Sequence, residues 1–191
     1  MLAIACPGGH PDSRTGVVRH FEGREGTPML ADMFVRYYTH LPFPFRETER
    51  ALTAVPADWL RSLAHGIQDR GEALFVEVGA RANGYKLATR VEVDIREPVR
   101  GASRTILPLS WTAVGGRGLF PLLQGDLEVA RLGPECTHLA ISARYQLPLG
   151  AAGTAPDRDV LHRIAEAAVK DFLDRTAHRL RALVVSRREA E

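Results

Sequence analysis

The hydrophobic positions in the last part of the chain recur with the period of a long amphipathic helix. From Asp157 to about Arg187, small or apolar residues return every three or four positions, as one face of a helix requires. They are Leu161, Ile164, Ala165, Ala168, Val169, Phe172, Leu173, Thr176, Leu180 and Leu183. About thirty residues rising about 1.5 Å each span about 45 Å. A helix of that length with one apolar face needs a broad apolar partner elsewhere in the chain.

The middle of the chain changes to a period of two, which is typical of strands with one buried face. The alternating segments are 74–78, 87–95, 107–113, 126–129 and 137–147. Between them lie residues that favour tight turns, at Asn83-Gly84, Arg100-Gly101, Gly115–Gly118 and Gly133-Pro134. Short connections between successive strands predict an antiparallel meander with one apolar face and one wet face.

The segment Met33–Leu41 fits two patterns. Its apolar residues suit a helical face, but it is dense in β-forming residues, and Pro42 and Pro44 stop it abruptly. We therefore favour a strand here. A short helix is predicted over Phe45–Ala54, and a second begins at Pro56 and is ended by Gly71.

The order of these elements predicts the domain organisation and the fold class. Residues 1–28 are rich in glycine, proline and charge, and we interpret them as a flexible or loosely docked N-terminal extension. Residues 29–191 form a single predicted domain of strand, two short helices, antiparallel meander and long helix. This order is typical of an α+β fold in which a curved sheet packs its concave face on the helix. Such an arrangement leaves a space between helix and sheet where a ligand can sit.

Two segments carry motifs as well as periodicity. Leu119–Leu127 contains a Phe-Pro…Gly-x-Leu pattern, and Tyr145–Gly150 a Tyr-x-x-Pro-Leu-Gly pattern just before the long helix. With Leu41-Pro42 leading into two short helices, residues 33–185 resemble the START-like superfamily (SRPBCC, polyketide cyclase/dehydrase and lipid transport), in particular its actinobacterial members. The sequence predicts six strands where that superfamily usually has seven, and the N-terminal extension is not part of its pattern.

The resemblance implies a helix-grip fold, with a curved antiparallel β-sheet wrapped around a long C-terminal α-helix and two short helices after the first strand. The superfamily contains lipid carriers, ligand sensors, aromatases and cyclases. It therefore implies a cavity more firmly than it implies a reaction.

Composition and charge exclude several classes of function. The chain of 191 residues is 45% hydrophobic and 25% charged, as in soluble globular proteins. A net charge of +2 gives no basic field for nucleic acid, and no apolar run reaches the about eighteen residues of a membrane span. The two cysteines, Cys6 and Cys136, show no metal-ligand spacing, and the N-terminus lacks the basic region of a signal peptide. We expect a cytoplasmic protein, and the arginine- and alanine-rich composition suggests a bacterial source.

The sequence carries no catalytic signature, and we predict no catalytic residue, no metal and no cofactor. The seven histidines show no metal-ligand pairing, and no nucleophile elbow is present. His162 and Glu166 are one helical turn apart, and we favour a solvated pair over a catalytic or metal dyad. His138, Asp126 and Glu128 occupy the polar phase of their strands, which favours the wet face of the sheet.

Two further patterns have simple structural interpretations. Gly115–Gly118 lacks the lysine and the following helix of a phosphate loop, so a hairpin turn is favoured. The arginines of 179–188 suit a solvated helix end better than an anion site, since Glu189 and Glu191 partly offset them.

Four aromatic residues are the candidate ligand contacts: Trp111, Phe120, Tyr145 and Phe172. Trp111 and Tyr145 fall on the apolar phase of what we take to be neighbouring strands, and Phe172 faces them from the helix. Large aromatic rings, some with one polar group, suit a pocket for a planar or lipid-like ligand, and they equally suit a filled core.

Three hypotheses follow. The first is a non-enzymatic carrier or sensor that binds a hydrophobic small molecule or lipid between helix and sheet. The second is a polyketide-type cyclase or aromatase, which requires an inward-facing acid or base, and for which Tyr145 is the one inward candidate. The third is a structural or interaction protein with a closed core. Whether the chain is an enzyme, which ligand it binds and its oligomeric state are left open by the sequence.

Overall fold

The computed structural model describes residues 32–54, 74–82, 85–113, 122–146 and 158–190. Several sequence predictions lie outside these ranges: the N-terminal extension 1–28, the second short helix, the glycine-rich turn 115–118 and Phe120. The described residues form seven strands and two helices. In chain order these are β1 (Asp32–Leu41), α1 (Phe45–Thr53), β2 (Leu74–Ala82), β3 (Tyr85–Ile95), β4 (Val99–Arg100), β5 (Arg104–Ala113), β6 (Leu122–Gly133), β7 (Cys136–Gln146) and α3 (Arg158–Ala190).

The strands form one antiparallel sheet in the order β1-β7-β6-β5-β3-β2, with β4 paired to β5 beside this path. The predicted count of six strands is wrong by one, because the two-residue β4 was missed. The favoured strand over Met33–Leu41 is confirmed as β1, which pairs with β7 along its whole length. The short helix predicted over Phe45–Ala54 is confirmed as α1.

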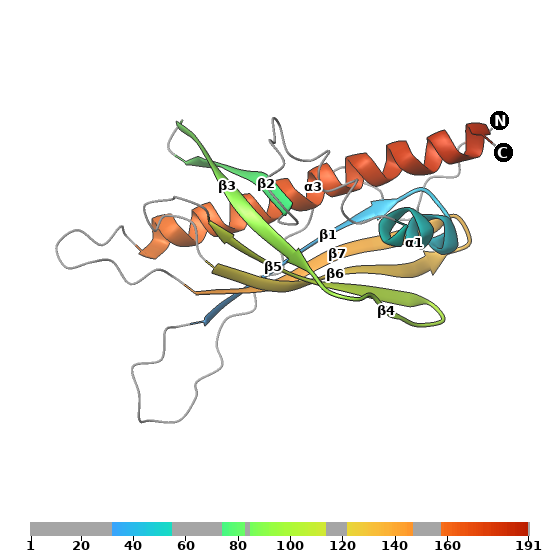
Figure 1. Cartoon of the computed structure of the whole chain (residues 1–191), viewed down its shortest axis with the longest axis horizontal. Coiled ribbons are helices and arrows are strands. Elements are labelled where there is room, and N and C mark those ends of the chain that lie inside the picture. Colours follow the sequence, from blue (N-terminus) through green and yellow to red (C-terminus); the bar gives the residue numbers. More distant parts are fainter. Residues whose placement is uncertain (1–31, 55–73, 83–84, 114–121, 147–157, 191) are drawn as a thin grey trace, which may run out of the picture.

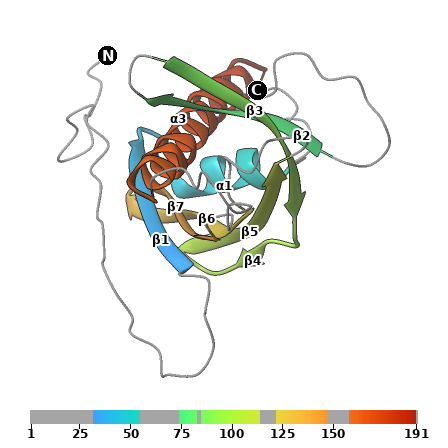
Figure 2. The same ribbon diagram turned by 90° about the vertical axis from the view of Figure 1, so that its left-hand side faces the viewer.

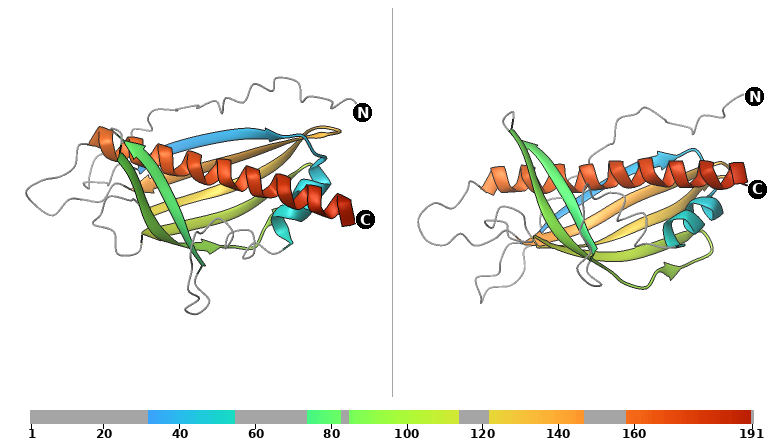
Figure 3. Two further views of the ribbon diagram at one scale, coloured as in Figure 1. Left: turned by 90° about the horizontal axis from the view of Figure 1, so that it is seen from above. Right: turned by 45° about the horizontal axis from the view of Figure 1, so that its top comes forward.

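The sheet curves around α3, which runs the length of its concave side (Figure 1). Seen from one end, the strands make an arc about the helix (Figure 2). Seen from above, α3 crosses the strands obliquely and reaches α1 near its C-terminal end (Figure 3). The predicted α+β arrangement of a curved antiparallel sheet around a long C-terminal helix is therefore confirmed.

Alternation along the strands produces the core, because successive side chains of a strand point to opposite faces. On β7 the inward residues from Thr137 to Tyr145 are buried, whereas Arg144 on the outer phase is exposed. Helix α3 buries the face that its periodicity predicts. Among its described side chains, the buried ones are Ala165, Ala168, Val169, Phe172, Leu173, Thr176, Ala177, Leu180 and Val184.

Helix α1 closes the end of the sheet near the C-terminus of α3. Its side chains Phe45, Ala51 and Leu52 are buried, and Arg188 of α3 donates from Nε to Glu47 Oε2 at 2.6 Å. The opposite end, where β5 ends, β6 begins, β7 ends and α3 begins, is here called the site end.

No helix in the described part of the chain is long and apolar enough to cross a membrane. Cys136, the first residue of β7, is buried and disulfide-bonded. Disulfides are uncommon in a reducing cytoplasm, so this bond does not support the cytoplasmic location expected from the sequence. That location stays a prediction.

Candidate functional site

Four residues on four strands form one row across the concave face, here called the concave row. Register pairs Val93 with Trp111, Trp111 with Leu123, and Leu123 with Tyr145. All four side chains are buried, because each falls on the inward phase of its strand. Trp111 and Tyr145 are thus on the same face, as predicted. They are not on neighbouring strands, however, because β6 lies between them and contributes Leu123.

Helix α3 places a third large ring against this row. Phe172 packs edge to face on Trp111, with ring centroids 5.3 Å apart and an interplanar angle of 63°. This is a preferred geometry for an aromatic pair, because the positive edge of one ring meets the negative face of the other. The structure therefore brings Trp111 and Phe172 into contact, while Phe120 lies outside the described residues. Their role as ligand contacts stays a prediction.

At one end of the row, Tyr145 of β7 meets two polar groups of α3, and the three residues are here called the polar chain: Tyr145, His162 and Glu166. The Tyr145 hydroxyl hydrogen-bonds to Nδ1 of His162, and the two rings stack with centroids 5.9 Å apart. On its other side, His162 Nε2 lies 3.1 Å from Glu166 Oε1. The pair forms at the spacing that the sequence gives, and each side chain is partly exposed, at 23%.

The surroundings of Tyr145 fix its protonation state. Burial raises the pKa of the Tyr145 phenol, and the neighbouring Glu166 and Tyr37 raise it further. The phenol therefore remains protonated through neutral pH, which makes it a hydrogen-bond donor rather than an anionic base.

A second polar cluster lies near the opposite end of the molecule. Glu49 of α1 is 5% exposed, and its carboxylate accepts from Thr105 Oγ1 at 2.5 Å and from Arg46 Nη1 at 2.9 Å. Burial alone raises the pKa of Glu49. The hydrogen bonds from Thr105 and Arg46, with the positive charges of Arg46 and Arg100, outweigh it and lower the pKa overall. This fully paired carboxylate fastens α1 to β5.

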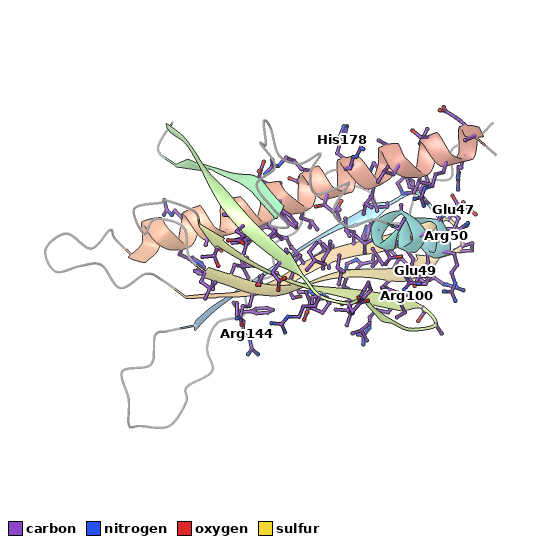
Figure 4. All side chains as sticks on the ribbon, in the orientation of Figure 1. Glu47, Glu49, Arg50, Arg100, Arg144 and His178 are labelled. Atoms are coloured by element: carbon purple, nitrogen blue, oxygen red, sulfur yellow. The ribbon has the colours of Figure 1, made fainter. Side chains whose placement is uncertain are left out.

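In Figure 4, Glu47, Glu49, Arg50 and Arg100 gather around α1, and Arg144 lies on the outer side of the sheet. His178 lies on the solvent side of α3 (Figure 4).

The outer face of the sheet carries a group of three rings. His40 and His138 are register partners on β1 and β7, with ring centroids 5.4 Å apart, and Tyr38 packs against both. Asp126 and Glu128 also lie on this outer phase, as predicted, with Asp126 exposed. His138 is half-buried rather than fully on the surface. In the described ranges, no group of three or more histidine, cysteine or acidic residues is arranged to hold a metal ion.

The C-terminal arginines are partly engaged within the fold. Arg188 lies 5.3 Å above the Phe43 ring and 3.9 Å from Glu135 in addition to its bond with Glu47. Arg181 donates to the carbonyl oxygen of His40 at 3.2 Å. These contacts fasten the end of α3 to the sheet, and they do not assemble an anion site.

Sequence reasoning missed the polar chain and the buried carboxylate. The His162–Glu166 spacing was visible, but its partner Tyr145 is on another element, and only the seating of α3 on the sheet reveals the contact. The one available signal was a phenol on an apolar strand phase, which needs a polar partner when it is buried.

Comparison with known proteins supports the fold and no closer relationship. No protein-family model and no curated protein matches the sequence. Norcoclaurine synthase from Thalictrum flavum, in complex with dopamine and hydroxybenzaldehyde, aligns at a TM-score of 0.52 and 9% identity, over 88% of this chain and 98% of that chain. A point mutant of that enzyme with a transition-state analogue aligns at 0.53 and 10% identity, over 83% and 97%. A conserved protein from Geobacillus kaustophilus aligns at 0.51 and 13% identity, over 78% and 95%.

These similarities, together with the order of strands, show that the chain has the START-like helix-grip fold. The predicted fold is therefore confirmed. At these identities the likeness establishes architecture, and function must be argued from the residues.

Proposed function

We propose that the chain binds a hydrophobic small molecule with planar aromatic character between α3 and the concave row. The observation that carries the proposal is the contact of Trp111 and Phe172 on the same concave face as Tyr145. Large rings from opposite layers, with a hydrogen-bonding group at one end, are the usual lining of a site for such a ligand. Burial of ligand surface at about 25 cal/mol per Å² supplies the affinity.

The fold lends support to this choice of ligand. Norcoclaurine synthase, which has the same architecture, holds dopamine and hydroxybenzaldehyde, two small aromatic molecules. A helix-grip sheet is thus able to accommodate a ligand of this class. The location of the polar chain at the site end gives the ligand one place for a hydroxyl or carbonyl group.

A second candidate function is a cyclase or aromatase acting on a planar or folding polyketide chain. From the sequence, Tyr145 was the one inward-facing acid or base. In the structure His162 contacts the Tyr145 hydroxyl, and Glu166 contacts His162. These three residues could supply the acid–base group that such an enzyme requires. The binding proposal does not depend on this second one.

The experiment is native mass spectrometry of gently purified protein, followed by extraction of any bound compound. We expect a mass adduct that is an apolar aromatic molecule, or a thermal shift with bicyclic and tricyclic aromatics in a panel that also contains fatty acids and sterols. A mass without any adduct, together with no thermal shift across the panel, would contradict the binding proposal and favour a closed structural core.

Matched variants locate the binding. Phe172→Leu keeps an apolar side chain and removes the ring, so it should weaken an aromatic ligand several-fold. Val185→Leu on the exposed face of α3 is the control and should leave affinity unchanged. Equal effects of the two changes would place the ligand elsewhere.

A further inference from the structure

We propose that Tyr145, His162 and Glu166 form a proton relay that takes a proton from a phenolic or enolic hydroxyl of the bound ligand. This inference rests on the proposed function, because the ligand must lie on the concave row for its hydroxyl to meet the Tyr145 oxygen. It names the ligand class more closely: a planar molecule with an acidic hydroxyl at one end.

The hydrogen-bond pattern fixes the direction of the relay. An ionised carboxylate only accepts hydrogen bonds, so the nitrogen facing Glu166, Nε2 of His162, carries the hydrogen. In neutral histidine the other nitrogen then has a free lone pair. In the proposed relay Nδ1, which is in hydrogen-bond contact with the Tyr145 hydroxyl, therefore accepts its hydrogen. Glu166 positions the imidazole and selects its tautomer, as the carboxylate does in other histidine-based relays.

The proposed step balances without any added reagent. The O–H bond of the ligand breaks, and its proton moves to the Tyr145 oxygen as the Tyr145 hydrogen moves to His162 Nδ1. The products are a ligand oxyanion, a neutral Tyr145 that donates its new hydrogen to that oxyanion, and an imidazolium beside the Glu166 carboxylate. Tyr145 stays neutral before and after the step, which agrees with a buried phenol that resists ionisation on its own.

The spacing of the concave row sets the size of the ligand. Adjacent strands lie about 4.8 Å apart, so Trp111 and Tyr145, separated by β6, stand about 10 Å apart at the backbone. A bicyclic or tricyclic ring system that packs near Trp111 reaches across Leu123 toward the Tyr145 hydroxyl. A single small ring does not cover both.

The same helix contains a matched control pair. Lys170 Nζ and Asp174 Oδ2 lie 2.6 Å apart at the same four-residue spacing, but both side chains are 45% exposed. Removing one charge of that pair tests the effect of losing a helix-surface ion pair, and leaves the polar chain intact.

The first test needs no ligand. NMR of protein labelled with ¹⁵N-histidine should show His162 as the Nε2–H tautomer, and Tyr145→Phe should shift its Nδ1 resonance. Glu166→Gln should change the tautomer balance, and Asp174→Asn should change neither signal. An Nδ1–H tautomer in the native chain, or an Nδ1 resonance indifferent to Tyr145→Phe, overturns the relay. Thermal unfolding of each variant confirms that it folds. The Tyr145 and Glu166 substitutions leave the His162 imidazole in place, so its resonances can be observed in every variant.

The second test uses 7-hydroxycoumarin, a planar bicyclic phenol whose anion absorbs at longer wavelength, and 7-methoxycoumarin, which has no acidic hydroxyl. We expect both to bind and the absorbance titration of the bound phenol to have its midpoint at least about one pH unit lower than in water, a tenfold change in ionisation. Glu166→Gln should abolish that shift and leave 7-methoxycoumarin affinity unchanged, and Asp174→Asn should leave both unchanged.

The outcomes separate the two proposals. If both coumarins bind and the midpoint does not fall, or falls equally in Glu166→Gln, the relay is overturned and the binding function stands. If neither coumarin binds, the proposed function fails for planar bicyclic ligands, and the relay loses its substrate whatever the tautomer of His162.

Discussion

The ring of Phe172 on α3 meets the indole of Trp111 on β5 edge to face, with centroids 5.3 Å apart. Both side chains are at most 2% exposed, so the pair is part of the packing that holds the helix against the sheet. The same two rings are the centre of the proposed ligand site. Their coupling therefore connects the stability of the fold with its function.

The first prediction concerns this coupling. In a double-mutant cycle of Trp111→Leu and Phe172→Leu, we expect each single change to lower the free energy of unfolding. The double mutant should lose less unfolding free energy than the two single mutants together, by about 0.5–1.5 kcal/mol. That difference is the usual interaction energy of an aromatic pair beyond its buried area. Urea denaturation measures all four proteins. Strict additivity would show that the two rings do not interact in solution.

Glu49 gives the second prediction. Glu49→Gln should lower the free energy of unfolding at pH 7 by about 1–3 kcal/mol, because it removes the charge that accepts the Arg46 and Thr105 hydrogen bonds. Glu47→Gln on the same helix breaks a more exposed pair with Arg188, and should cost at most about 1 kcal/mol.

The pH dependence of stability checks the sign of the Glu49 effect. Because folding lowers the pKa of Glu49 below 4.5, its contribution is present above pH 4.5 and is lost as pH falls through the folded value. The wild type should therefore lose more stability than Glu49→Gln on acidification below pH 4.5. Identical acid profiles would contradict this.

Gly125 gives the third prediction. A Cβ built there meets the Ser142 carbonyl oxygen at 2.6 Å and the Ala143 Cβ at 2.9 Å, whereas one on Gly133 meets nothing closer than the Cys136 Cβ at 3.8 Å. We expect Gly125→Ala to destabilise by about 1–3 kcal/mol and Gly133→Ala to change stability by no more than about 0.5 kcal/mol. Thermal unfolding compares them, and equal effects would contradict the close approach of β6 and β7.

His138 gives the fourth prediction. Burial lowers its pKa below 6.5, the positive charges of His40 and Arg36 lower it further, and Glu128 opposes the shift. Below pH 6.5 the unfolded chain therefore binds a proton that the folded chain excludes. This contribution to stability is complete above pH 6.5 and falls as pH drops toward the folded value.

NMR titration of the His138 ring should give a midpoint below 6.5. His138→Gln should flatten the stability profile just under that pH. A midpoint at or above pH 6.5 would show that the His138 ring is more exposed to water in solution than it is in the structure.

Most of the architecture follows from local periodicity. A period of two assigned the inward and outward phases of β3, β5 and β7, and a period of 3.6 assigned the buried face of α3. β4 was missed because Val99 and Arg100 are two exposed residues, too few to show alternation. β6 was predicted over 126–129 only, because Gly125 and the apolar but exposed Leu122 break the alternation of a strand that runs from Leu122 to Gly133.

The candidate site could be predicted less completely from local periodicity. Trp111 and Tyr145 were placed on the correct face by strand phase, but which helix residue meets each of them depends on how α3 lies on the sheet. His162 and Tyr145 are 17 positions apart and on different elements, so no local pattern links them. The same limit hid the contact of Glu49 with Thr105, which spans 56 positions.

The measurement that tests the central claim most directly is an NMR titration of ¹⁵N-labelled protein with the best aromatic ligand from the panel. We expect the largest shifts at the Trp111 indole N–H and at backbone amides around Leu123, Tyr145 and Phe172, with those of Tyr38 and His138 on the outer face unmoved. Shifts confined to the outer face, or none at saturating ligand, would contradict binding between α3 and the concave row.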